Sequence, residues 1–225
     1  MNPIHQCLRF LNGQALLPVL FASGLACALY AGRVILSGEL TFLFLVWNLF
    51  LAWIPYLVSL CSAGVYRLQP RLWGLLLLPA AGWLLFLPNA PYLVTDLIHL
   101  APRPPVPLWY DLGLLATFAW AGLFLGLFSL RAMQAIVRDL VGGPVSWLFV
   151  AGVIGLSGLG IYIGRFLRWN SWDLFFHPQH IMREVTTLIS TPAGSLQTLG
   201  VTVLFAAFLL VCYLTLTSPT SPERM

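Results

Sequence analysis

The stretch LGLLATFAWAGLFLGLFSL, residues 112–130, contains no charged side chain and only two hydroxyl side chains, Thr117 and Ser129. A transmembrane helix needs about 20 consecutive, mostly apolar residues, because each residue rises about 1.5 Å along a hydrocarbon core about 30 Å thick. The length and composition of this stretch therefore predict a helix that crosses a lipid bilayer. A chain built from several such stretches is an integral membrane protein.

The composition of the whole chain agrees with this interpretation. Of its 225 residues, 60% are hydrophobic and only 8% are charged, and the mean hydropathy is +0.89. Soluble domains carry about 25% charged residues, so a soluble globule and a disordered chain are excluded. All eleven basic residues are Arg, and they lie scattered between apolar runs. Nucleic-acid binding needs a clustered basic face, so no nucleic acid is expected as a partner.

Six stretches are long and apolar enough to be membrane spans, although the third is short. Backbone groups in lipid must be hydrogen-bonded internally, so we predict an all-α membrane protein of six transmembrane helices. Residues 1–217 form one six-span domain in this prediction, and residues 218–225 form a short disordered tail. The predicted spans are Ala15–Gly32, Leu40–Ser62, Leu72–Leu87, Leu112–Leu130, Val145–Gly164 and Leu196–Leu216.

The loops between the spans predict an orientation and a functional face. With the N-terminus inside, six Arg lie on the inner side and five on the outer side, and the positive-inside rule then places both termini in the cytoplasm. We expect a multi-pass protein of the inner (cytoplasmic) membrane. Two connections, 88–111 and 165–195, are long, partly helical and on the same outer face. Binding and chemistry concentrate in loops, so a site is expected there.

The first long loop begins PNAPYLVTDLIHL at Pro88. Asn89 suits a helix N-cap and Pro91 a first helical turn. Tyr92, Thr95, Asp96 and His99 then follow at i, i+3, i+4 and i+7, which is one face of a helix. This polar stripe either faces water and lipid headgroups from an interfacial helix or turns inward to line a site. In the second case Asp96 and His99 would be an acid/base or ligand pair.

The second long loop begins RFLRWNSWD at Arg165. Trp169 suits an interfacial anchor, and Asn170 with Asp173 resembles a reciprocal helix cap. Arg165 and Arg168, one helical turn apart, are not explained by anchoring. They either form ion pairs with acids on the same face or bind an anion. Because unpaired charges at a membrane surface are costly, we expect Asp96 or Asp111 within ion-pair distance of Arg165 or Arg168.

Several other signals predict no chemistry. His177 and His180 flank the helix-breaking Pro178, with Glu184 beyond, so three convergent ligands for a metal are not expected. The four cysteines form no CxxC pair, and no cofactor is expected. No predicted span carries an ionisable group in its interior, which disfavours an ion-coupled transporter. Glycines at GxxxG spacing, Gly122 and Gly126, and the glycine-rich fifth span predict that the fourth and fifth spans are close neighbours.

Three longer segments resemble a known family: FLPNAPYLVTDLIHL (Phe86–Leu100), WYDLGLLATFAWAGLFLGLFSL (Trp109–Leu130) and GIYIGRFLRWNSWDLF (Gly160–Phe175). They are similar to the signature segments of a bacterial multi-pass membrane family known as domain of unknown function 1361. The resemblance implies a six-span helical protein and implies no activity. The family pattern it suggests includes Asn89, Tyr92, Asp96, His99, Asp111, Arg165, Arg168, Asn170 and Asp173.

These observations lead to one functional hypothesis and one alternative. The hypothesis is a polar outer-face site, built from the loops 88–111 and 165–195, that binds an anionic or polar ligand such as a lipid or polyprenyl-phosphate headgroup. If the protein is an enzyme, Arg165 and Arg168 would hold a phosphate and Asp96 or His99 would move a proton. The alternative is a non-enzymatic assembly factor or small subunit that docks a membrane-protein partner. The candidate ligand-binding residues are Asn89, Tyr92, Asp96, His99, Trp109, Asp111, Arg165, Arg168, Trp169, Asn170 and Asp173.

Overall fold

The computed structural model describes residues 13–167, 169, 179 and 192–218, with side chains from residue 196 onward in the last segment. The described part is helical and contains no β-strand, and six of its helical segments are long and apolar enough to cross a membrane. The prediction of an all-α, multi-pass membrane protein is confirmed. The elements are α2 (Leu16–Ser37), α3 (Leu43–Leu68), η1 (Pro70–Leu76), α4 (Leu77–Phe86), α5 (Asn89–Tyr92), η2 (Leu93–His99), α6 (Leu108–Val141), α7 (Gly143–Tyr162), η3 (Ile163–Leu167) and α10 (Pro192–Thr217).

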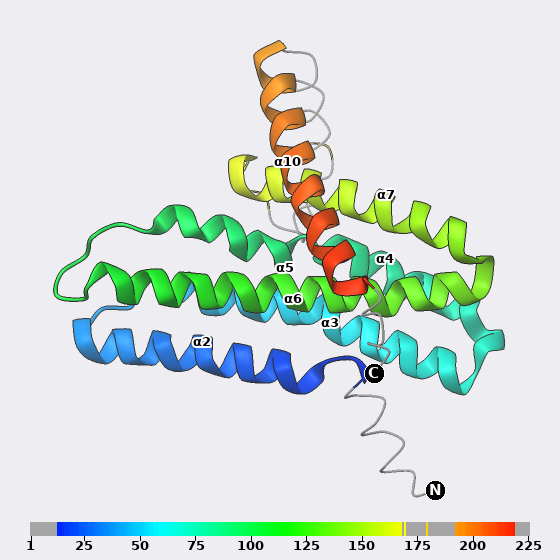
Figure 1. Cartoon of the computed structure of the whole chain (residues 1–225), viewed down its shortest axis with the longest axis horizontal. Coiled ribbons are helices and arrows are strands. Elements are labelled where there is room, and N and C mark those ends of the chain that lie inside the picture. The colour runs from blue at the N-terminus through cyan, green and yellow to red at the C-terminus, as the bar shows by residue number, and fades with distance from the viewer. Residues whose placement is uncertain (1–12, 168, 170–178, 180–191, 219–225) are drawn as a thin grey trace, which may run out of the picture.

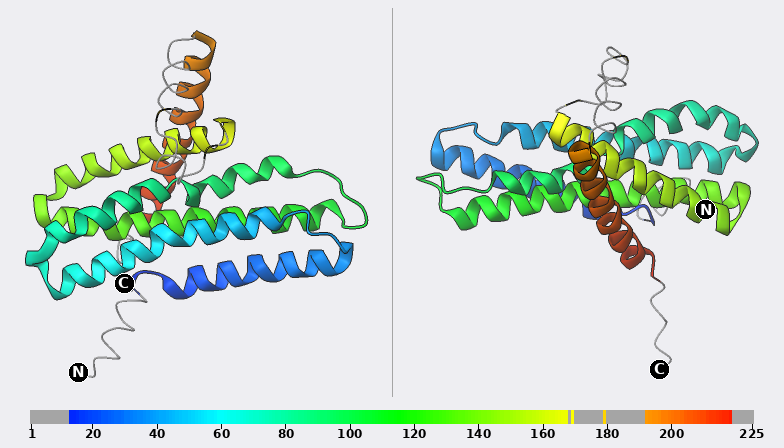
Figure 2. Two further views of the ribbon diagram at one scale, coloured as in Figure 1. Left: turned by 180° about the vertical axis from the view of Figure 1, so that it is seen from behind. Right: turned by 90° about the horizontal axis from the view of Figure 1, so that it is seen from above.

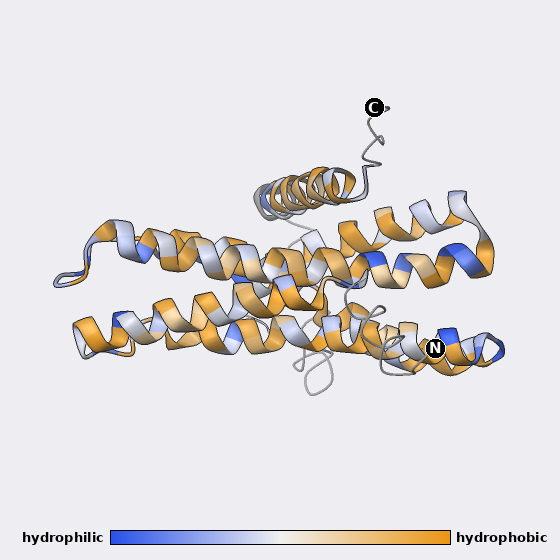
Figure 3. Ribbon diagram, turned by 60° about the horizontal axis from the view of Figure 1, so that its bottom comes forward, coloured by the Kyte–Doolittle hydropathy of each residue, from blue (hydrophilic) through white to orange (hydrophobic). Residues whose placement is uncertain are grey.

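Helix α6 lies at the centre of the bundle (Figure 1). It packs against α2, α3, α5, η2 and α7, whereas α10 packs mainly against α7 and crosses the other helices obliquely (Figure 2). The predicted span Leu112–Leu130 lies within α6 and carries no charged side chain. A larger share of α6 is buried than of any other described span. Most helical residues are hydrophobic (Figure 3), and many large hydrophobic side chains are exposed, as lipid contact requires.

The third span is longer than its sequence predicts. It runs from Pro70 to His99 through η1, α4, α5 and η2, and it does not end at Pro88. The predicted N-cap at Asn89 is wrong: Asn89 is the first residue of α5, and its amide donates back to the carbonyl of Phe86 at 3.0 Å. Proline removes one N–H but keeps a helical φ, so the chain continues past it. The first long loop is therefore mostly helix, and only residues 100–107 connect η2 to α6.

The glycines of the fourth and fifth spans make close contacts, but with other partners than expected. Helices α6 and α7 are neighbours, as predicted. A Cβ on Gly122, however, would lie 2.4 Å from the backbone oxygen of Ala90, and a Cβ on Gly158 would lie 2.5 Å from the backbone oxygen of Thr202 on α10. Small residues thus bring α5 onto α6 and α10 onto α7. The first of these contacts positions the segment that carries Asp96 and His99.

Candidate functional site

The described charged residues of the predicted site gather at one end of the bundle, where α2 ends, α3 begins, η2 ends and α6 begins. We call this the site end. It is the end at which the connection 100–107 turns back (Figure 1). The short π-helical turn η3, which continues α7, brings Arg165 to the same region.

Arg165 holds the polar stripe of the third span. Its Nη1 lies 3.2 Å from Oδ1 of Asp96 and 3.4 Å from the hydroxyl of Tyr92, and its Nη2 lies 3.2 Å from Nε2 of His99. The side chain of Asp96 is only 3% exposed, and that of Arg165 is 17% exposed. Asn48 on α3 donates to Oδ2 of Asp96 at 3.0 Å. We call Asn48, Tyr92, Asp96, His99 and Arg165 the polar cluster.

Helical spacing explains why three members of the polar cluster face one partner. Tyr92, Asp96 and His99 lie four and three residues apart, so they form one row on the surface of the segment. The structure has the inward orientation of this stripe, with Asp96 buried, and it confirms the expected ion pair between an acid of the first loop and an Arg of the second. Thr95, the fourth residue of the predicted stripe, donates instead to the backbone oxygen of Tyr92.

The contacts of His99 fix the role of its ring nitrogens. A guanidinium has only donors, so Nε2 of His99 accepts from Arg165 and the ring proton is assigned to Nδ1. Phe44 packs edge-on against the imidazole at 5.0 Å between ring centroids. Both oxygens of Asp96 accept hydrogen bonds as well. The cluster therefore holds Arg165 in a fixed place, and a proton-transfer role for Asp96 or His99 stays a prediction.

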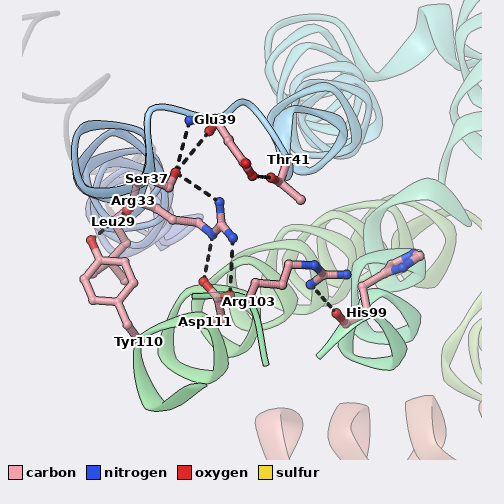
Figure 4. A network of polar contacts seen from close by, with 9 residues as sticks. All are labelled: Leu29, Arg33, Ser37, Glu39, Thr41, His99, Arg103, Tyr110 and Asp111. Atoms are coloured by element: carbon pink, nitrogen blue, oxygen red, sulfur yellow. Dashed lines mark hydrogen bonds and ion pairs between the residues drawn. The ribbon is translucent and has the colours of Figure 1, made fainter. Parts of the chain in front are cut away.

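Asp111 makes a different ion pair. Its Oδ1 accepts from Nε of Arg33 at 2.8 Å and its Oδ2 from Nη2 at 3.4 Å, and both side chains are at most 1% exposed (Figure 4). The ring of Phe42 lies under Arg33, 4.6 Å from its guanidinium carbon, and Arg103 lies 5.0 Å from the same ring. This pair clamps α2 to α6, and we call it the Arg33–Asp111 clamp.

Arg33 was not predicted as a site residue, because the first apolar run ends at Gly32. Helix α2 continues to Ser37, so Arg33 lies in its last turns, as Asp96 lies near the end of η2 and Asp111 in the first turn of α6. The helices are longer than the apolar runs, and they carry these ionisable groups near their ends and not in their interiors. The sequence did hold a signal for this pair. Arg33 directly follows one apolar run and Asp111 directly precedes another, and both positions belong to the same end of the bundle.

A cavity of about 460 Å³ adjoins the polar cluster. It lies between α3, α4, α5 and α7, and it shares Asn48 and Tyr92 with the cluster. Its remaining described walls are mainly apolar, and they contain no charged side chain. The lining residues are Asn48, Leu51, Ala81, Leu84, Leu85, Pro88, Asn89, Tyr92, Leu156, Leu159, Gly160, Ile163, Gly164 and Trp169.

The predicted site residues thus divide into those at the polar cluster or the cavity, those that lie elsewhere, and those outside the described residues. Tyr92, Asp96, His99 and Arg165 lie in the polar cluster, and Asn89 and Trp169 line the adjoining cavity with Tyr92. Asp111 belongs to the clamp, and Trp109 is 70% exposed on the opposite face of α6, so neither lines the cavity. Arg168, Asn170 and Asp173 lie outside the described residues, as do His177, His180 and Glu184. Within the described residues no three His, Cys, Asp or Glu side chains converge as metal ligands.

Comparison with known proteins identifies a family but no activity. A family model described as "Protein of unknown function (DUF1361)" matches residues 47–212, which is well over half of the chain, and the chain belongs to this family. No curated protein and no solved structure matches it. The matched region contains the whole polar cluster and every described cavity residue, from Asn48 to Trp169, whereas Arg33 and Phe42 precede it.

Proposed function

We propose that this protein binds a membrane amphiphile whose hydrocarbon chain occupies the cavity and whose polar or anionic headgroup lies beside the polar cluster. One observation carries the proposal: a cavity with leucine-rich walls includes Asn48 and Tyr92 in its lining, and these two residues also bond to Asp96 and Arg165. A ligand that is apolar over most of its length and polar at one end matches this gradient. In our proposal the site end faces the outside of the inner membrane.

The size and position of the cavity support a lipid-like ligand. Pockets of about 300–1,000 Å³ hold one drug-sized molecule, so about 460 Å³ suits one hydrocarbon chain with part of its headgroup, and is small for both chains of a phospholipid. The cavity lies within the span helices, among leucines from α3, α4 and α7. A chain can therefore enter from the bilayer, and a single-chain lipid or a polyprenyl tail fits such a path.

A cavity-filling variant tests the proposal. Leu156 on α7 lines the cavity and is 52% exposed, so Leu156→Trp should narrow the cavity without overpacking the core. Leu148→Trp is the control, because Leu148 lies on the same helix, is 72% exposed and is not part of the cavity lining. Native mass spectrometry from gentle detergent should show lipid bound to the wild type and to the control, and at least several-fold less on Leu156→Trp.

The same measurement can contradict the proposal. Equal lipid retention by all three proteins would show that bound lipid does not occupy this cavity. A wild type that carries no lipid but purifies with a stoichiometric membrane-protein partner would favour the assembly-factor alternative instead.

A further inference from the structure

We infer that the cavity selects its ligand by hydroxyl groups, so that the preferred amphiphile carries an uncharged, hydroxyl-bearing headgroup such as a glycerol and not a phosphate. This inference rests on the proposed amphiphile binding and specifies its chemistry. It depends on the hydrogen-bond donors and acceptors of the described cavity walls that have no partner within the protein.

Among the described residues, the positive charge that lies beside the cavity wall is already paired with an acid. Arg165 forms its ion pair with the buried carboxylate of Asp96, and its two terminal nitrogens also contact Tyr92 and His99. The described lining itself holds no charged side chain. A phosphate in the cavity would therefore lose its water without gaining a cationic partner from the described walls, and burial of an unpaired charge is strongly unfavourable.

The walls offer hydrogen-bond acceptors for a physical reason. One N–H of the Asn48 amide donates to Asp96, and among the described residues its oxygen Oδ1 accepts no hydrogen bond. Two further wall residues, Leu51 and Leu84, precede prolines by four positions. Because Pro55 and Pro88 have no N–H, the backbone carbonyls of Leu51 and Leu84 lose their ordinary helical donor. Polar backbone groups without a partner are costly in lipid, so a donor from a ligand is favoured.

A hydroxyl group satisfies these walls better than a phosphate. The hydroxyl of Tyr92 accepts from Arg165, so its own proton can be donated to a ligand oxygen. An alcohol both donates and accepts, and it can therefore bond to the amide or carbonyl oxygens and to Tyr92 at once. An ionised phosphate only accepts, so it could bond to Tyr92 or to the second N–H of Asn48 but not to the oxygens of Asn48, Leu51 and Leu84.

The test compares three probes that share one oleoyl chain: 1-oleoylglycerol, 1-oleoylglycerol 3-phosphate, and the dimethyl ether of 1-oleoylglycerol, which cannot donate. Each is titrated against the delipidated full-length protein in detergent and scored by native mass spectrometry. We expect the wild type to bind 1-oleoylglycerol at least tenfold more tightly than either of the other two probes.

A proline variant then tests the assigned acceptor. Pro55→Ala returns an N–H to the carbonyl of Leu51, so the helix should be at least as stable while 1-oleoylglycerol binds about two- to tenfold more weakly, the loss of one net hydrogen bond. Pro79→Ala is the control, because it also returns an N–H to a helix, but neither Pro79 nor Leu75, four residues before it, lines the cavity. Its affinity should equal that of the wild type.

The outcomes separate this inference from the proposed function. Binding of the phosphate or the dimethyl ether as tight as that of 1-oleoylglycerol overturns hydroxyl selection, and so does a folded Pro55→Ala with unchanged affinity. Amphiphile binding in the cavity survives either result if Leu156→Trp still displaces the probe. If no probe binds the wild type and no lipid purifies with it, the proposed function itself fails. The wild-type comparison of the three probes decides the inference even if Pro55→Ala does not fold.

Discussion

The site end of this protein contains two Arg–Asp pairs that differ in what surrounds them. In the Arg33–Asp111 clamp, both side chains are at most 1% exposed, the closest approach is 2.8 Å, and protein atoms surround the pair. The Asp96–Arg165 pair is longer, at 3.2 Å, its Arg is 17% exposed, and it adjoins a cavity of about 460 Å³. The same two residue types thus make a closed helix-to-helix contact in one place and, in the other, a pair that contacts two residues of the cavity wall, Asn48 and Tyr92.

The difference teaches that charge inside a membrane helix does not by itself mark a functional site. Intramembrane ionisable residues point to function by default, yet the clamp satisfies its charges completely and leaves no space for a ligand. The family match also separates the two, because it includes the whole polar cluster and only Asp111 of the clamp. Space beside a charge, more than the charge, distinguishes the candidate site.

The largest expected effect comes from breaking the clamp. Arg33→Leu leaves Asp111 buried without a partner, which costs about 3–5 kcal/mol, so we expect loss of folded protein or a strongly lowered melting temperature in detergent. The double variant with Asp111→Leu should recover most of the stability, because it removes the unpaired charge as well. Arg131→Leu, at an exposed position where the guanidinium donates to the backbone oxygen of Gly13, is the control and should change little. A single variant as stable as the wild type would show that the clamp is not a closed structural pair.

The next effect concerns the packing that supports only one of the two pairs. Gly122→Ala places a Cβ 2.4 Å from both the backbone oxygen of Ala90 and Cδ1 of Leu93. Because one of the clashing atoms is backbone, we expect a cost near the upper end of about 1–3 kcal/mol and weaker retention of lipid as η2 shifts. Gly113→Ala on the same helix meets nothing within 4 Å and should be neutral or slightly stabilising. Unchanged lipid retention in a destabilised Gly122→Ala would disconnect this packing from the site.

The smallest effect on stability is expected at Arg165. Arg165→Ala removes one charged partner of Asp96 but leaves the hydrogen bond from Asn48, so the cost should lie toward the lower end of about 1.5–3 kcal/mol. Arg165→Lys should recover part of this, yet one ammonium cannot contact Tyr92, Asp96 and His99 together, so bound lipid should stay reduced. Thermal unfolding and lipid retention, measured on both variants, check this. A loss of stability as large as that of Arg33→Leu would remove the distinction between the two pairs.

Much of the architecture follows from the sequence because it depends on local periodicity. The six apolar runs predict six spans, and the i, i+4, i+7 spacing places Tyr92, Asp96 and His99 on one helix face without any tertiary information. The exact ends of the helices do not follow, because a run of apolar residues ends before the helix does: Arg33, Asp96 and Asp111 all lie in helical residues beyond or at the end of the predicted runs.

The amino-acid sequence by itself determined the membrane class, the all-α fold and the face shared by the acidic and aromatic residues of the third span. The tertiary structure alone decided that Asp96 pairs with Arg165, that Asp111 pairs with Arg33 seventy-eight residues away, and that a cavity adjoins the first pair. Five acids and five Arg were available on the predicted outer face, and their charges attract one another equally well in any combination. Which pairs form depends on which helices pack side by side, and that is set by shape: the glycines of α6 and α7 admit α5, α10 and Pro88 at close range, and the remaining space becomes the cavity.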